Sequence, residues 1–300
     1  MRFDPFYINS AVASLDQTSA LEQQLTNEIS SGKRVNALGD DPVAAGQNIL
    51  LSGQLQMNDS FSQTESSIVG RLQVTDSTLG SVVSQLTQAL SLAVQGNNGA
   101  LNSDNIKSIA TQLSGIRDEI VALANTAYMG TYLFSGSQGT TEPYSVDTSV
   151  SPNTVTYNGD SVVSSVMTPN GQKIQVNVPG NAIFSDSTNN VLGALNNLIG
   201  EFSTGSASSA SQADATALNS ALNYVSQQRV VIDNSITRLQ AAADYAQMQG
   251  TQILAAQTTL MQADVAKVST QLSTAETQQT ALTQVIMLLE KNNGDLFSLL

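Results

Sequence analysis

Few residues in this sequence could do chemistry. Its 300 residues include no histidine and no cysteine, which removes the commonest general base, the imidazole metal ligand and the thiolate ligand. Two pairs of adjacent carboxylates could serve as acid and base, namely Asp40-Asp41 and Asp118-Glu119. Neither pair is framed by a glycine-rich loop or a plausible base. Helix capping explains the first pair, and a solvated helix face explains the second.

Other catalytic and binding patterns are also missing from the sequence. There is no Gly-x-x-x-x-Gly-Lys-Ser/Thr phosphate loop, and a serine nucleophile would have to act without histidine. The formal net charge of −13 argues against nucleic acid as a partner. We therefore predict that the protein is not an enzyme, needs no cofactor or metal, and binds no nucleic acid.

Hydropathy along the chain gives an expectation for its location. Residues 1–7 lack the basic start and continuous apolar core of a secretory signal peptide. No run approaches the ~18 apolar residues that a bilayer-spanning helix needs. We therefore predict no membrane insertion. The chain either stays in the cytoplasm or leaves by a route that needs no cleaved signal.

Both ends of the chain carry a heptad pattern. Steps of four and three from Leu254 reach Leu289 through eleven positions, of which nine are apolar, as in a coiled-coil helix. The same stepping from Ile8 continues to Ile29, and Gly32 follows as a typical helix terminator. Because one narrow apolar edge does not offset the entropy of ordering such a helix alone, we predict that the two terminal helices pair and also contact neighbouring chains.

We use the name assembly seam for the apolar positions that should make these contacts. The alternative interpretation of the two terminal heptad patterns is a pair of unrelated coiled-coil arms. The assembly seam consists of Ile8, Leu15, Leu25, Ile29, Val265, Val268, Leu272, Leu282, Ile286 and Leu289.

Helical patterns also fill much of the interior of the chain. Asp41 suits the N-cap and Pro42 the first position of a long helix that runs to about residue 96. The next helix opens at Ser103-Asp104, either of which can cap it, and its spacing continues to residue 127. The short connection between these helices predicts antiparallel neighbours.

A further helical pattern covers residues 218–250 and leads to the last helix. The heptad register shifts at Gly250, which predicts a stutter or break. Asp264 could then cap a separate last helix.

The segment between these helical regions, residues 135–188, has the pattern of β-structure. Asn158-Gly159 predicts a hairpin turn after a strand at 154–157. Pro169-Asn170-Gly171 predicts a second turn, before the alternating strand at 173–178. A short helix follows. The predicted fold class is mainly α: an elongated antiparallel helical bundle with paired N- and C-terminal coiled-coil helices and a small inserted β domain.

Two stretches of the sequence resemble a known family. Residues 29–36, Ile-Ser-Ser-Gly-Lys-Arg-Val-Asn, and the Asp-Asp-Pro that follows at 40–42 resemble the amino-terminal signature of the bacterial flagellin family. Residues 262–267 and 294–300 are similar to the carboxyl-terminal helix of that family, although the chain ends in Leu-Phe-Ser-Leu-Leu where a tyrosine would be expected. Within the family, Asp-Asp-Pro and the segment 125–136 favour the members at the hook–filament junction.

The resemblance implies three domains joined by a connector. Residues 1–41 with 264–300 would form an inner terminal helical domain, and residues 42–134 with 205–263 a long-helix rod domain. Residues 135–204 would form a projecting β insert with a short helix. The implied inter-domain connector consists of Lys33, Arg34, Asn36, Asp40, Asp41 and Pro42. For the two cations of this set, a solvated pair at a helix end is the alternative.

The resemblance also implies a function. The chain would be a structural adapter of the bacterial flagellum that joins the hook-associated zone to the flagellin filament, with filament-forming flagellin as the alternative. It would be secreted by the flagellar type III apparatus and would lie at the hook–filament junction. Its partners would be hook-associated protein 1, flagellin, further copies of itself in a ring, and a cytoplasmic export chaperone at the C-terminal helix. A coiled-coil adhesin, a third reading, would need its own secretion signal.

Overall fold

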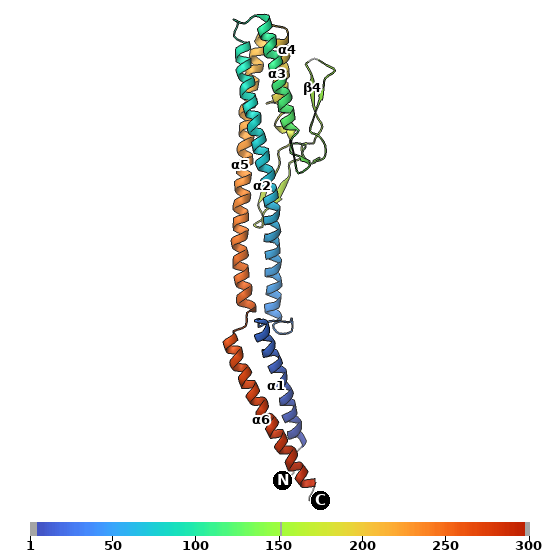
Figure 1. Cartoon of the computed structure of the whole chain (residues 1–300), viewed down its shortest axis with the longest axis vertical. Coiled ribbons are helices and arrows are strands. Elements are labelled where there is room, and N and C mark those ends of the chain that lie inside the picture. The colour runs from blue at the N-terminus through green and yellow to red at the C-terminus, as the bar shows by residue number, and fades with distance from the viewer. Residues whose placement is uncertain (1–4, 151, 298–300) are drawn as a thin grey trace. The chain divides into compact units, whose positions relative to one another are not determined.

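The computed structural model describes residues 5–150 and 152–297 (Figure 1). In this part of the chain the helices are α1 (Pro5–Ser31), α2 (Pro42–Gly96), α3 (Ser103–Ala124), α4 (Val191–Ser203), α5 (Ser209–Met261) and α6 (Val265–Phe297). Among the described residues no helix is long and apolar enough to cross a membrane. The prediction of a mainly α bundle with paired terminal helices and a small β insert is confirmed.

The chain divides into two compact units. The terminal unit comprises Met1–Met57 and Met248–Leu300, and the central unit comprises Asn58–Gln247. The division into three domains stays a prediction.

In the terminal unit, α1 and α6 lie side by side and run antiparallel (Figure 1). Gln279 Nε2 in α6 donates a hydrogen bond to Ser19 Oγ in the middle of α1, at 3.1 Å. The residues that follow α1 pair with those that precede α6. A small hydrophobic core holds this unit together, and it consists of Leu25, Ala263, Val268 and Ala275, with Ile29 and Leu272 packed against it.

Single residues set the helix ends in the terminal unit. Gly32 has a φ of 67°, a left-handed conformation that glycine adopts readily, and it ends α1 as expected. Asp264 Oδ1 accepts a hydrogen bond from Lys267 N at 3.1 Å. Asp264 therefore caps a separate last helix, as the sequence indicated.

Of the stutter or break predicted at Gly250, the break is wrong, because α5 continues through this residue to Met261. Gly250 is buried, and a Cβ at this position would lie 3.4 Å from Leu55 Cδ1 of α2. A methyl group at this position would thus make an ordinary van der Waals contact with α2, and the heptad register changes within one continuous helix.

The central unit packs residues 58–96 of α2 and 209–247 of α5 with α3 and α4 around one hydrophobic core. Side chains from all four helices are completely covered. Those with no exposed surface include Leu79, Leu86, Leu113, Ile120, Leu195, Leu198, Val225 and Leu239. This is the close packing expected of a stable domain interior.

The start of α3 differs from the prediction by one residue. Asn102 is the N-cap, and its Oδ1 accepts a hydrogen bond from Asn105 N at 2.9 Å. An asparagine side chain offers the same acceptor as the predicted Ser103 or Asp104. The helix also ends earlier than expected, because residues 127–128 form a strand, β1 (Ala127–Tyr128), that pairs with β2 (Thr131–Tyr132).

Two further antiparallel pairs make up the β segment. β3 (Tyr144–Asp147) pairs with β4 (Thr154–Tyr157), with Tyr144 opposite Tyr157. Asn158-Gly159 therefore follows β4 instead of turning it back into a new strand, so the predicted hairpin turn is wrong. β5 (Ser165–Met167) pairs with β6 (Lys173–Gln175), and Gly171 with a φ of 81° lies in the predicted turn between them.

Three arginines hold the β segment to the helices of the central unit, and one of them, Arg238 of α5, donates from its Nη2 to Lys173 O at 3.3 Å. Arg71 Nη2 of α2 donates a hydrogen bond to Val176 O at 3.0 Å. Arg117 of α3 is 1% exposed, and its Nη1 donates to Asn153 O at 3.4 Å and to Asn196 Oδ1 of α4 at 3.2 Å. The β segment is thus a tethered part of the central unit.

Candidate functional site

The structure brings the inner part of the assembly seam together between α1 and α6. Leu25 is 4% exposed and Val268 is 5% exposed. Ile29 and Leu272 pack against them. Each helix therefore covers the apolar edge of the other over this stretch, as the heptad pattern predicted.

The rest of the assembly seam is less covered. Its half-buried positions are Leu15, Leu282 and Ile286. Val265, in the first turn of α6, is 50% exposed. The side chains of Ile8 and Leu289 lie outside the described residues. The pairing of α1 with α6 therefore leaves much of the predicted contact surface open within a single chain.

A groove runs along the α1–α6 pair, and we call it the terminal groove. Its first part has a volume of about 710 Å³ and is lined by α1, α6 and the residues around the end of α5. Its second part, of about 510 Å³, lies nearer the start of α1 and shares Leu21 and Gln278 with the first. The apolar lining consists of Leu21, Leu25, Ala263, Val268, Ala275, Ala281, Leu282 and Val285.

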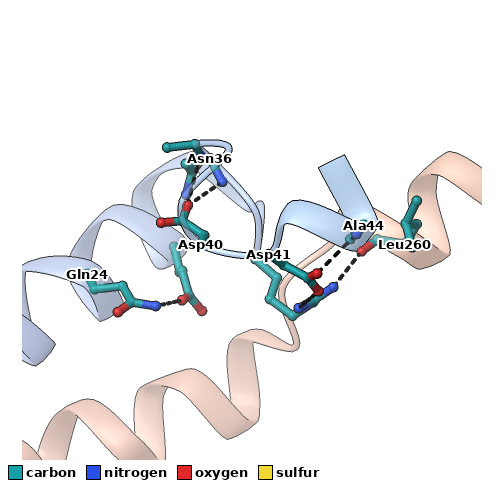
Figure 2. Close-up of polar contacts among 9 residues, drawn as sticks. Gln24, Asn36, Asp40, Asp41, Ala44 and Leu260 are labelled. Carbon is teal, nitrogen blue, oxygen red and sulfur yellow. Dashed lines mark hydrogen bonds and ion pairs between the residues drawn. The ribbon is translucent and has the colours of Figure 1, made fainter. Parts of the chain in front are cut away.

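Glu28 is a buried charged residue in the wall of the terminal groove. It is 7% exposed and lines the larger part of the groove. Its Oε1 accepts a hydrogen bond from Gln24 Nε2 at 3.0 Å, and Figure 2 shows Gln24 from α1 making this contact. Among the described residues no cationic group lies within 4.0 Å of its carboxylate.

The two chain segments that leave α1 and enter α6 are held to each other by backbone hydrogen bonds. Arg34 N donates to Met261 O at 2.7 Å, and Ala263 N donates to Gly32 O at 3.0 Å. These bonds form an isolated antiparallel β-bridge. The connector predicted between residues 33 and 42 therefore also includes residues 261–263, which carry no prediction of such a role from the sequence.

Arg34 joins the start of α2 to the end of α5. Its Nη1 donates to Asp41 Oδ2 at 3.0 Å, and its Nη2 donates to Leu260 O at 3.1 Å (Figure 2). Asp41 Oδ1 accepts a hydrogen bond from Ala44 N at 3.0 Å, so Asp41 is the N-cap of α2 and Pro42 its first residue, as predicted. The Ala44 N–H and then the Arg34 guanidinium lower the pKa of Asp41.

Asp40 closes the loop before α2. Its Oδ2 accepts hydrogen bonds from Ala37 N at 2.8 Å and from Asn36 N at 2.9 Å (Figure 2), and these two N–H groups lower the pKa of Asp40. Asn36 Nδ2 donates to Lys33 O at 3.0 Å, while the Lys33 side chain is exposed. Asp40 and Asp41 thus bind separate backbone groups, and they act as caps rather than as an acid–base pair.

Two buried residues near the connector were not singled out by the sequence pattern. Val35 is 2% exposed, whereas Leu38 in the same loop is 65% exposed, so apolar character alone could not have marked Val35 as an anchor. Glu28 has no sequence signal either, because a glutamate on a heptad helix usually faces solvent. Its burial follows only from the neighbours that cover it.

The second carboxylate pair is also accounted for by structure. Asp118 Oδ1 accepts hydrogen bonds from Arg117 Nε at 3.0 Å and Arg117 Nη2 at 2.7 Å. Its side chain is 55% exposed, and Glu119 is exposed as well. In the part of the chain that the structure describes, no group of three or more acidic side chains could hold a metal ion.

Comparison with known proteins finds similarity to flagellar hook-associated proteins and to flagellins. Residues 7–139 match the family described as the bacterial flagellin N-terminal helical region. The flagellar hook-associated protein 3 of Salmonella typhimurium is 29% identical over 201 residues, which cover 64% of this chain and 63% of that protein, just under two thirds. The protein of the same name from Escherichia coli is 27% identical over 231 residues, which cover 71% of this chain and 73% of that protein.

A solved structure gives the same picture of the fold. The flagellar junction protein FlgL of Legionella pneumophila matches with a TM-score of 0.57 at 15% identity, over 72% of this chain and 100% of that chain. At this identity the match shows a shared fold. The family resemblance predicted from the sequence is thus confirmed: residues 7–139 match the bacterial flagellin N-terminal helical region, and the chain is similar to flagellar hook-associated protein 3.

Proposed function

We propose that this chain is a structural adapter of the bacterial flagellum that joins the hook-associated zone to the flagellin filament. The observation that carries the proposal is the α1–α6 pair, which leaves part of the assembly seam and a long groove uncovered. Exposed apolar surface of this kind is typical of helices that complete their packing with neighbouring chains. The similarity to hook-associated protein 3 supports a place at the junction. The role is structural rather than catalytic.

The three predicted domains would divide this work. Residues 1–41 with 264–300 would join a ring of copies, and residues 42–134 with 205–263 would form the rod outside it. Residues 135–204 would project. Identical subunits that meet head to tail propagate without limit unless the end surfaces differ. A junction layer solves this problem because it meets hook-associated protein 1 on one side and flagellin on the other.

Export would precede assembly. Met287 and Leu288 on α6 are 59% and 62% exposed, and such side chains promote aggregation in the cytoplasm. We therefore propose that a cytoplasmic export chaperone covers the C-terminal helix. The chain would then leave through the flagellar type III apparatus and reach its final place at the hook–filament junction outside the cell.

Removal of the tail tests this proposal. Cells that produce the chain without residues 264–300 should form complete hooks without filaments and should release unpolymerised flagellin into the medium. Electron microscopy and immunoblots of the medium measure these outcomes. Normal filaments on cells with the tail deletion would contradict a junction role.

A matched pair of variants separates the assembly seam from the rest of α6. Leu272→Asp with Leu282→Asp should reproduce the loss of filaments, because both residues contribute to the α1–α6 contact or the groove beside it. Ser273→Asp with Thr280→Asp adds the same charge at exposed positions of α6 and should leave filaments intact. Equal loss in both variants would point to a general failure of secretion or helix formation.

A filament-forming flagellin is the second candidate, and the family match to a flagellin region favours it. Copy number distinguishes the two. Mass spectrometry of purified flagella should find this chain in a single small ring, far below the amount of flagellin. Thousands of copies per flagellum would instead identify a filament subunit.

A further inference from the structure

Among the described residues of its own chain, Glu28 in the terminal groove has no partner of opposite charge within 4.0 Å. Two cationic residues line the same part of the groove, Arg34 and Lys267. Arg34 is engaged elsewhere, by Asp41 and by Leu260 O. Lys267 is exposed and makes no ion pair within 4.0 Å among the described residues. A covered carboxylate with one amide partner is stabilised by a cation that reaches it.

The C-terminal part of α6 presents a surface that complements this groove. Gln284, Met287, Leu288 and Lys291 are exposed, and their spacing of three, four and seven residues places them on one face of the helix. The face is apolar at Met287 and Leu288 and cationic at Lys291. The terminal groove offers an apolar lining and a buried carboxylate, which complement the apolar and cationic side chains of this face.

The two surfaces cannot meet within one chain. Gln279 of α6 lies opposite Ser19 of α1. From this point, Glu28 lies nine residues along α1 in one direction, and Lys291 lies twelve residues along α6 in the other direction. At about 1.5 Å per residue, Glu28 and Lys291 are roughly 30 Å apart along the pair. Only another copy of the chain can bring the two together.

We propose that the terminal groove binds residues 284–291 of a second copy of this chain, with Lys291 of that copy paired to Glu28. The proposal deepens the ring assembly of the proposed function and rests on it for its biological setting. The contact is heterologous, since each copy offers one groove and one complementary helix face, so it can continue from copy to copy until a ring closes. Charge complementarity fixes the register, while the apolar side chains supply burial.

Cross-linking tests this contact directly, because the natural chain has no cysteine. Full-length Glu28→Cys and Lys291→Cys chains with different tags are mixed, both in concentrated solution and on growing flagella, and are treated with a short bis-maleimide. The expected product is a dimer with one chain of each kind, in several-fold excess over dimers of either kind alone. The control pairs Lys291→Cys with Asp16→Cys, an exposed position of α1 outside the groove lining. Equal yields from the two pairs would overturn the proposal.

Charge reversal provides a second test with a built-in control for folding. Glu28→Lys or Lys291→Glu alone should reduce the number of copies per flagellum by roughly tenfold or more, and the two changes together should restore it. Circular dichroism of each purified variant confirms that helix content is unchanged. Failure of the double variant to regain assembly would overturn the pairing.

The two tests also separate this contact from the junction role. If the natural chain is absent from flagella, the proposed function fails, while cross-linking in solution still decides the contact. If Glu28→Cys lowers the amount exported but cross-links to Lys291→Cys no better than Asp16→Cys does, the groove serves an export partner and the proposed occupant is wrong.

Discussion

The central and terminal units start from the same heptad pattern and reach different degrees of burial. In the central unit Leu79, Leu86 and Leu113 have no exposed surface. In the terminal unit Leu25 is 4% exposed, while Leu21 on the same helix is 43% exposed. Helices of the central unit are covered by several neighbours, whereas α1 and α6 cover only one edge of each other. The comparison teaches that heptad spacing predicts where a helix is apolar, but the number of neighbours decides whether that surface is buried.

Hydroxyl side chains on α6 bond to its own backbone, as they also do on α2 of the central unit. Five threonines of α6 each donate a hydrogen bond to the carbonyl oxygen four residues earlier. These are Thr270, Thr274, Thr277, Thr280 and Thr283. Such bonds add little to helix stability and often bend the helix. The helix therefore depends on packing, which the single chain supplies only in part. We infer that the central unit folds alone and that the terminal unit reaches full order only when neighbouring chains cover it.

The largest expected effect is on core truncations in the two units. Leu113→Ala should lower the free energy of unfolding of the isolated chain by about 2–5 kcal/mol, because it leaves a cavity in a closed core. Leu25→Ala should leave this main transition unchanged, since the terminal unit contributes little to it. Denaturant unfolding followed by circular dichroism measures both. A large loss in Leu25→Ala would show that the two units unfold together and would remove the contrast.

The sequence predicts the helices better than the contacts between them. The caps at Asp41 and Asp264 depend on one side chain and the adjacent backbone, so local chemistry is sufficient to find them. The Asn158-Gly159 turn failed because β4 pairs with the preceding strand β3, and strand pairing overrides a local turn preference. The burial of Glu28 depends on residues of α6 that are far away in the sequence, so no local pattern predicts it.

A smaller effect is expected from the helix caps. Asn102→Ala removes the N-cap of α3 in the central unit and should lower the free energy of unfolding by about 1 kcal/mol. Asp264→Ala removes the matching cap of α6 and should leave the main transition unchanged. It should instead speed proteolysis near residue 264, because the first turn of α6 frays more often without its cap. Mass spectrometry of the early cleavage products checks this, and unchanged cleavage there would mean that the terminal unit is as firmly held as the central one.

The smallest expected effect is a response to pH of opposite sign in the two units. Burial raises the pKa of Glu65 in the central unit, and the charge of Asp244 adds to the shift. The folded state therefore favours protonated Glu65, so its contribution to stability is complete below the ordinary pKa of about 4.3 and is lost as pH rises through the folded value. In the connector the pKa of Asp41 is lowered. Its contribution is present above about 3.9 and is lost as pH falls through the folded value.

Two neutral variants isolate these responses from the other carboxylates. In the natural chain, protonation of Glu65 should add to the free energy of unfolding as pH is lowered from neutral towards 4. Glu65→Gln should lack this gain in the main unfolding transition. In Asp41→Asn the amide keeps an oxygen for the Ala44 N–H but loses the charge that faces Arg34. The natural chain should therefore become more sensitive to an acid-active protease at residues 32–41 as pH falls, while the variant should be sensitive at every pH. If both variants changed the same transition in the same direction, the connector would unfold together with the central unit. The two regions would then not differ in stability.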